Sequence, residues 1–211
     1  MKVTFLLLVV FVSVGHGQSI RMTKVSPIYN VEVHSGECGA DDKCGPITVE
    51  LSRKGSRSIF QTITAGRIPK SDIATSIEFV DLDFDGVRDL SVFDGFEGTG
   101  GYITLGQRIY VYSKKDGRFV FNTGISEISR RENLASFELD KRRKLIYTHA
   151  RPGGGVFQMR GYKFVKGTPV LMYETIDDAT FADGTKTKLT TRRLIIGRWR
   201  TWTKVYKGPL N

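Results

Sequence analysis

The chain has 211 residues and a formal net charge of +10, with 32 Lys and Arg against 22 Asp and Glu. After the N-terminal segment, no apolar stretch approaches the length of a transmembrane span. Only His34 and His149 remain as histidines beyond that segment, and neither lies in a nucleophile, metal or acid–base motif. We therefore expect a binding protein and not an enzyme, with no catalytic residues.

The N-terminus is typical of a secretory signal peptide. Lys2 precedes an apolar run from Phe5 to Val14, and small residues follow at the expected cleavage site. We expect cleavage after Gly17, so that residues 1–17 are the signal peptide and residues 18–211 form a single domain. No cysteine follows the cleavage region, so no lipid anchor is indicated. The expected location is the periplasm, or outside the cell.

The only two cysteines, Cys38 and Cys44, are expected to form a disulfide. The alternatives are two free thiols or a metal site. The spacing and the lack of a nearby histidine ligand disfavour a metal site, and export favours pairing. The crosslink is expected to stabilise the fold by roughly 2–3 kcal/mol through the entropy of the unfolded chain.

The mature chain is predicted to be all-β and antiparallel. Short runs rich in β-branched and aromatic residues recur along it: Ile28–Val33, Ile47–Leu51, Ser58–Thr64, Ile77–Val80, Leu90–Phe93, Arg108–Tyr112, Arg118–Phe121, Lys144–His149, Val156–Val165, Pro169–Glu174 and Lys188–Ile196. Turn signals separate them, among them Asp116-Gly117, Lys166-Gly167 and Asp183-Gly184. Helical periodicity is confined to one turn near Ile125–Arg131. This spacing favours either a small β-propeller-like fold or a β-sandwich.

Residues 81–90 predict a structural calcium loop. Carboxylates stand at its positions 1, 3, 5 and 9, contributed by Asp81, Asp83, Asp85 and Asp89. Calcium takes 6–8 oxygen ligands, and alternate residues of a tight loop can all point inward. Gly86 permits the sharp turn, and the Val87 carbonyl is expected to supply a further oxygen. The alternative is an Asp-rich surface turn without a metal.

The loop differs from an EF-hand because position 12 is Val92 and not Glu, and apolar strands flank it in place of helices. Asp89 is therefore expected to take the part of the missing carboxylate. A strand–DxDxDGxxD–strand unit resembles the calcium loops of FG-GAP and VCBS-type β repeats.

A series of motifs follows the calcium loop in a fixed order. They are Gly98-Thr99-Gly100-Gly101-Tyr102, Arg108-Ile109-Tyr110-Val111-Tyr112, Asp116-Gly117-Arg118-Phe119, Gly161-Tyr162-Lys163-Phe164 and Pro169-Val170-Leu171-Met172-Tyr173-Glu174. Over residues 77–174 this order resembles exported β proteins related to the periplasmic inhibitors of i-type lysozymes. That family includes immunity proteins against lysozyme-like toxins of type IV secretion systems.

The resemblance implies an inhibitory loop formed by Gly98, Thr99, Gly100, Gly101 and Tyr102, which enters the cleft of a lysozyme-like peptidoglycan hydrolase. Glycines allow close approach, the Thr hydroxyl can bond a catalytic carboxylate, and Tyr is a rigid anchor. The neighbouring calcium loop is expected to fix the base of this loop. The alternative function is a calcium-stabilised FG-GAP/VCBS-like module that binds glycan or envelope components.

Basic and aromatic residues alternate near the C-terminus. They include Arg192, Arg193, Arg198, Trp199, Arg200, Trp202, Lys204 and Tyr206. Nucleic-acid binders combine such residues, but a final strand or hairpin with solvated charges is the favoured interpretation, and no nucleic-acid partner is expected. The positive charge favours an acidic partner or an anionic envelope surface.

Overall fold

The computed structural model describes residues 19–22, 26–38, 44–66, 75–93, 106–131, 137–153, 155–179 and 186–207. The predicted signal peptide, the Gly98–Tyr102 loop and the Asp183-Gly184 turn lie outside these residues. Within them, no helix is long and apolar enough to cross a membrane.

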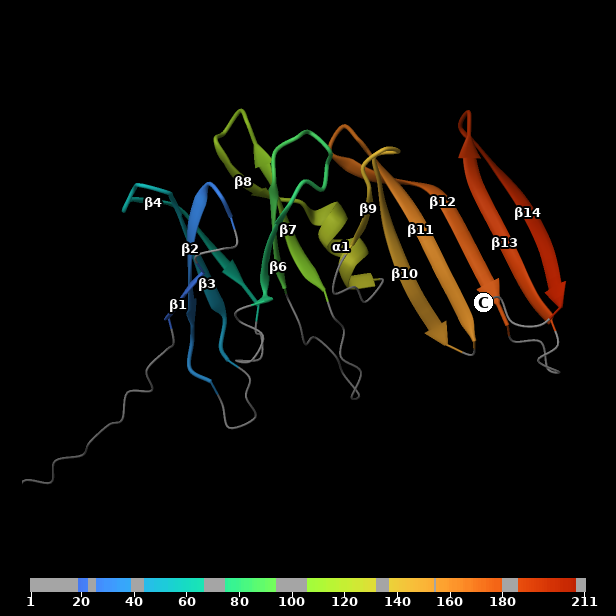
Figure 1. Cartoon of the computed structure of the whole chain (residues 1–211), viewed down its shortest axis with the longest axis horizontal. Coiled ribbons are helices and arrows are strands. Elements are labelled where there is room, and N and C mark those ends of the chain that lie inside the picture. The colour runs from blue at the N-terminus through green and yellow to red at the C-terminus, as the bar shows by residue number, and fades with distance from the viewer. Residues whose placement is uncertain are drawn as a thin grey trace, which may run out of the picture.

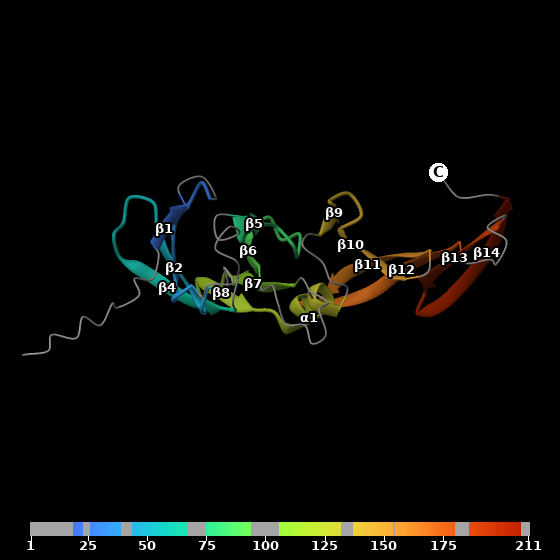
Figure 2. The ribbon, with the colours of Figure 1, turned by 90° about the horizontal axis from the view of Figure 1, so that it is seen from below.

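The described residues form three antiparallel sheets, which follow one another in sequence order along the long axis (Figures 1 and 2). The first contains β1 (Ser19–Met22), β2 (Tyr29–Ser35), β3 (Ile47–Arg53) and β4 (Ile59–Ala65). The second contains β5 (Ile77–Val80), β6 (Asp89–Phe93), β7 (Gln107–Ser113) and β8 (Arg118–Phe121). The third contains β9 (Glu138–Asp140), β10 (Leu145–Gly153), β11 (Val156–Val165), β12 (Thr168–Asp178), β13 (Lys186–Ile195) and β14 (Arg198–Lys207).

The second sheet is buried on both faces, as a propeller blade is. Tyr110 and Tyr112 of β7 belong to a core shared with the first sheet. The alternate residues Ile109 and Val111 belong to a second core, which includes Ile146 of the third sheet. The prediction of an antiparallel all-β domain is confirmed. The sheets stack like blades, and the first and third lie at opposite ends of the molecule without closing a ring (Figure 1).

The helix α1 (Thr123–Arg131) is longer than the single turn that the sequence predicts. Asn122 caps it, because its Oδ1 accepts the amide hydrogen of Ile125 at 3.0 Å. Ser126 and Ser129 accept the amides of Ile109 and Gln107 through their hydroxyls, at 2.9 and 3.0 Å. β8 pairs only with residues 110–113 of β7, so the helix supplies hydrogen-bond partners to the part of β7 that β8 does not reach.

Candidate functional site

The Asp loop, residues 81–89, connects β5 to β6, and a buried side chain within it packs into the second core. Leu82 is fully buried in the second core, while Asp81 and Asp83 beside it are half-buried. Asp81 accepts the amides of Asp85 and Gly86, each at 3.1 Å. Phe84 and Gly86 both have positive φ, at 61° and 86°. This conformation winds the loop tightly enough to bring alternate carboxylates together.

Asp89 is the buried member of the loop, with 1% of its surface exposed. Its Oδ2 accepts the amide of Leu82 at 2.8 Å, and its Oδ1 accepts the amide of Tyr112 at 3.0 Å. Burial raises the pKa of this carboxyl to about 7, and the negative charge of Asp83 adds to the rise, while the amides of Tyr112, Leu82 and Asp83 oppose it. An ionised Asp89 is therefore short of positive charge in the metal-free fold.

Three of the four predicted carboxylates meet. Oxygens of Asp81, Asp83 and Asp89 all lie within 4.8 Å of one another, a separation that one cation can bridge. Burial raises the pKa of Asp83, and the Asp85 charge raises it further. The charges of Asp83 and Asp89 are thus unfavourable without a cation. The three carboxylate oxygens are hard ligands, and this chemistry fits calcium.

Asp85 is placed differently from the other three. Its Oδ2 lies 2.8 Å from Nζ of Lys114, which comes from the turn between β7 and β8, and its Oδ1 accepts the amide of Val87 at 2.7 Å. Burial alone would raise the pKa of Asp85, but the hydrogen bond from Lys114 holds it below its ordinary value. The ammonium group of Lys114 therefore already balances the charge of Asp85. The role of the Val87 carbonyl as a ligand stays a prediction.

The predicted inhibitory loop, Gly98–Tyr102, lies outside the described residues, but the structure defines its base. Phe93 of β6 pairs with Gln107 of β7, so residues 94–105 leave and return at one place. The Phe93 amide donates to the Ser76 carbonyl at 2.7 Å, and the Ser91 hydroxyl lies 2.6 Å from Gln107 Oε1. These buried bonds fix the two strands from which the connection rises.

The expectation that the calcium loop fixes this base is wrong. Asp89 begins β6 and Phe93 ends it, so the two loops lie at opposite ends of one strand. At about 3.3 Å per residue, roughly 13 Å separate them. The base is held instead by Ser76, Ser91 and α1.

Cys38 and Cys44 form the predicted disulfide, with an S–S distance of 2.05 Å. Gly36 and Gly45 pack back to back beside it, where an added Cβ on Gly36 would lie 3.2 Å from the Gly45 Cα. The disulfide thus closes the end of the β2–β3 hairpin and is consistent with an exported protein.

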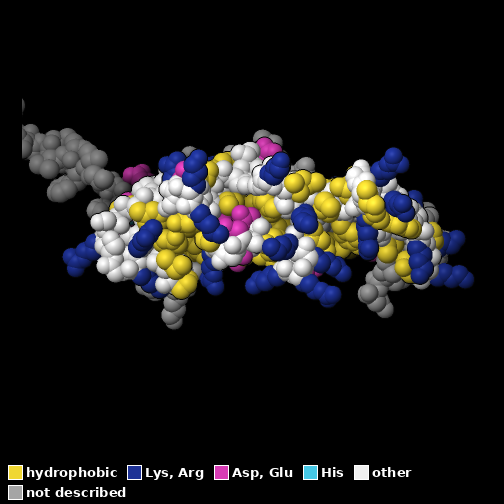
Figure 3. Space-filling view, turned by 90° about the horizontal axis from the view of Figure 1, so that it is seen from above, with side chains coloured by type: hydrophobic (Ala, Val, Ile, Leu, Met, Phe, Trp, Pro, Cys, Tyr) yellow, Lys and Arg dark blue, Asp and Glu magenta, His cyan; other side chains and the backbone are white. Residues whose placement is uncertain are grey.

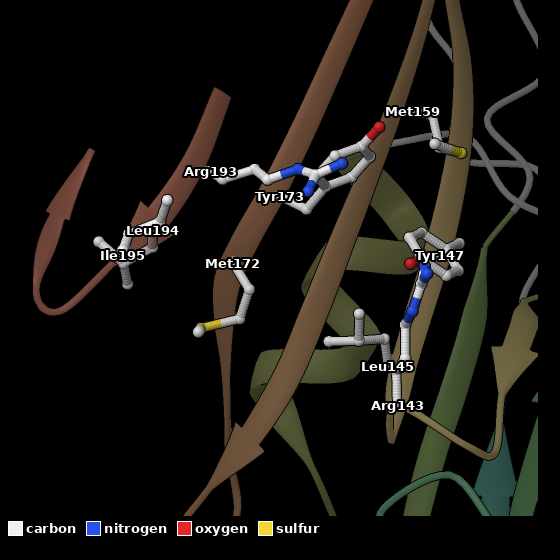
Figure 4. Close-up of a pocket in the computed structure, with 9 residues that line it drawn as sticks. All are labelled: Arg143, Leu145, Tyr147, Met159, Met172, Tyr173, Arg193, Leu194 and Ile195. Carbon is white, nitrogen blue, oxygen red and sulfur yellow. The ribbon is translucent and has the colours of Figure 1, made fainter. Parts of the chain in front are cut away.

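A groove of about 430 Å³ on the third sheet was not predicted from the sequence (Figure 4). Its lining comes from four strands and one turn: Arg143, Leu145, Tyr147, Met159, Met172, Tyr173, Arg193, Leu194 and Ile195. Gly161 leaves room for the rings of Tyr147 and Tyr173, which meet edge to face at 6.3 Å. The Arg193 guanidinium lies over Tyr173 at 5.1 Å from the ring centre. The sequence shows the alternating pattern of each strand, but it does not show which strands pair side by side, and the groove depends on that pairing.

The opposite face of the same sheet holds a buried ionic network centred on Glu174. Its carboxylate accepts bonds from Arg160 and Arg192, each at 3.0 Å, and from Gln158 at 2.9 Å. Burial would raise the pKa of Glu174, but the hydrogen bond from Arg160 and the two positive charges lower it below its ordinary value. Arg192 also stacks on Trp199 at 5.0 Å, which links β12 to β14.

The fold is similar to that of a Xanthomonas protein described as related to the type IV secretion system. The TM-score is 0.66 and the identity 18%, and the similarity covers 88% of this chain and 93% of the other. No protein-family model matches the chain, and no curated protein sequence matches it. At this identity the similarity establishes the shared fold, which extends over nearly the whole of both chains.

Proposed function

We propose that this chain is an exported protein, associated with a type IV secretion system, that inhibits a lysozyme-like peptidoglycan hydrolase. The observation that carries the proposal is the similarity of fold to the Xanthomonas protein over 88% of the chain. The order of motifs over residues 77–174 resembles that of lysozyme inhibitors and related immunity proteins. From this resemblance we infer that the target is a lysozyme-like enzyme.

The inhibitory element is the connection between β6 and β7, with Thr99 and Tyr102 as its contact residues. β6 and β7 are paired, and the bond between Ser91 and Gln107 holds their ends together. Fixed ends lower the conformational entropy that the connection would lose on binding. Thr99 would donate a hydrogen bond to a catalytic carboxylate, and Tyr102 would fill the cleft. Because the chain is basic, we expect a neutral or acidic target enzyme.

Calcium has a structural part in this proposal. Asp81, Asp83 and Asp89 would supply the core ligands, and the ion would neutralise a buried carboxylate. Because the Asp loop lies at the other end of β6 from the inhibitory connection, the ion would stabilise the central sheet without contacting the target.

The proposal is tested by measuring peptidoglycan lysis in the presence of purified residues 18–211. Lysozymes of the c, g and i types and any lysozyme-like toxin encoded beside this gene are assayed. Tyr102→Ala should abolish inhibition while the melting temperature is kept. Tyr206→Ala on β14 is the matched control and should inhibit normally. Inhibition that survives Tyr102→Ala and Thr99→Val would contradict the proposed loop.

The groove on the third sheet favours a second candidate, a calcium-stabilised module that binds glycan or envelope components. The half-buried Tyr173 would contact a sugar ring beside the buried Tyr147, and Arg193 would bond a carboxylate or hydroxyl group. Calorimetry with soluble peptidoglycan fragments distinguishes the two candidates. Binding that is lost in Tyr173→Ala and kept in Tyr102→Ala would favour the module.

A further inference from the structure

The β13–β14 hairpin, residues 186–207, forms the end of the molecule and is unusual in charge. It carries no Asp or Glu, and its eight basic residues are Lys186, Lys188, Arg192, Arg193, Arg198, Arg200, Lys204 and Lys207. Figure 3 shows dark blue side chains over the whole visible face, with several of them at this end. β14 is the edge strand, and all its residues are exposed except the half-buried Tyr206. β14 therefore presents both of its faces to the surroundings.

The turn of this hairpin contains Ile196, an apolar residue that contributes nothing to the packing of the fold. Ile196 is 96% exposed and has a φ of 48°, followed by Gly197 at 71°. Such a two-residue turn with two positive φ values favours Asn-Gly, whereas a β-branched residue at positive φ is strained. The β11–β12 turn has the same geometry, with φ of 53° and 78°, and it places Lys166 at this position. Ile196 thus neither packs against the fold nor suits its own turn.

Apolar and basic residues alternate close to the turn. Ile195 pairs with Arg198 and Leu194 with Trp199, so Trp199 lies one pair behind the turn. At about 3.3 Å per residue, these two pairs lie within roughly 7 Å of the tip. A surface-bound apolar element penetrates about 5–10 Å into the boundary between lipid headgroups and acyl chains. The apolar side chains of the tip thus extend over a length that matches this penetration depth, and the arginines beside them would lie at the level of the headgroups.

We propose that the β13–β14 hairpin is a membrane-surface anchor, which inserts Ile196 and Trp199 into an anionic lipid leaflet while Arg198 and Arg200 bind headgroup phosphates. Charge complementarity selects an anionic surface, since no acidic residue of the hairpin opposes it. Tryptophan favours the interfacial depth that the tip reaches. The proposal is independent of the inhibitory loop, which lies on another sheet.

The arrangement of the aromatic residues disfavours a nucleic acid as the occupant. Trp199 is opposite Leu194 and Trp202 is opposite Thr191, and the odd and even positions of a strand face opposite sides. The two indoles therefore lie on opposite faces, whereas single-stranded nucleic acid binds to an aromatic platform on one face. An apolar tip that enters lipid has no such requirement.

The test measures binding of the mature chain, residues 18–211, to vesicles of phosphatidylglycerol and phosphatidylcholine in equal parts, with pure phosphatidylcholine as the neutral control. The only two tryptophans of the chain, Trp199 and Trp202, lie on this hairpin, so intrinsic fluorescence reports on it directly. We expect a blue shift and quenching by brominated lipid with the anionic vesicles only.

Two variants separate insertion from general attraction. Ile196→Asn should weaken vesicle partition about tenfold or more, because one aliphatic side chain no longer enters the lipid. The same variant should keep or raise the melting temperature, because Asn suits the conformation of the turn. Arg198→Glu with Arg200→Glu should weaken partition on the order of 100-fold. Lys186→Glu with Lys207→Glu makes the same charge change on the same hairpin, about 30 Å from the tip, and should have a much smaller effect.

Three results would overturn the proposal. The first is equal loss of binding for the two charge-reversal pairs, which would mean that only net charge matters. The second is unchanged partition of Ile196→Asn. The third is an absence of blue shift and of bromolipid quenching with anionic vesicles. Tight binding of single-stranded DNA, or self-association through the β14 edge, would then identify a different occupant.

Discussion

Calcium should raise the thermal stability of the protein, and the increase should be largest above pH 7. Burial moves the pKa of Asp89 from 3.8 to about 7 in the metal-free fold. One pKa unit corresponds to about 1.4 kcal/mol, so an ionised Asp89 destabilises this fold by up to about 4 kcal/mol. The folded state holds a proton that the unfolded state has released between about pH 4 and 7. Metal-free stability therefore declines as pH rises through this window and stays low above it.

The size of the calcium effect follows from mass action. Calcium at about 100 times its dissociation constant stabilises the fold by about 2.7 kcal/mol. For a domain of this size that corresponds to roughly 5–11 °C in melting temperature. Melts followed by circular dichroism, with chelator and with added calcium at pH values on either side of 7, measure both the shift and its pH dependence.

Two variants of the same loop, each lacking one charge, identify the ligands. Asp83 belongs to the cluster and has a raised pKa, so Asp83→Asn should leave the metal-free fold intact and remove the calcium response. Asp85 pairs with Lys114, so Asp85→Asn should retain most of the response. Equal loss in both variants would contradict the three-carboxylate assignment. Wild-type melts that coincide with and without calcium would refute the site itself.

Three further perturbations test the fold through thermal melts. Glu174→Ala removes the carboxylate to which Arg160, Arg192 and Gln158 are bonded and should destabilise the fold by about 2–4 kcal/mol. Because the pKa of Glu174 is lowered, the stability that it contributes is present above its unfolded pKa and should disappear as pH falls through the folded value. Asn122→Ala removes the α1 cap and a 3.1 Å bond to the Gly167 carbonyl, and should cost about 1–2 kcal/mol. Cys38→Ser with Cys44→Ser should cost about 2 kcal/mol, with no further effect of reductant. Unchanged melting temperatures would contradict each role.

Local patterns in the sequence predict most of the strands. Alternation places β3 and β11 close to their observed bounds, and the Asp116-Gly117 and Lys166-Gly167 pairs form hairpin turns with positive φ at glycine. The length of α1 is not predicted, because its apolar face consists of only two buried residues, Ile125 and Ile128. The serine hydroxyls that bond to the edge of β7 come from a tertiary contact that local periodicity does not reveal.

The candidate metal site is predicted in part, for a physical reason. Spacing alone brings Asp81, Asp83 and Asp89 together, since they belong to one loop. The position of Asp85 depends on Lys114, which comes from a different hairpin, and sequence spacing carries no information about that approach. The Glu174 network and the groove depend in the same way on the register of four strands.

Titration of a lysozyme-like peptidoglycan hydrolase with purified residues 18–211 tests the central claim most directly. The proposal predicts that lysis falls linearly to zero at one inhibitor per enzyme for at least one of the c-, g- or i-type enzymes or the neighbouring toxin. Undiminished lysis by all of them, at inhibitor concentrations far above the enzyme, would contradict it.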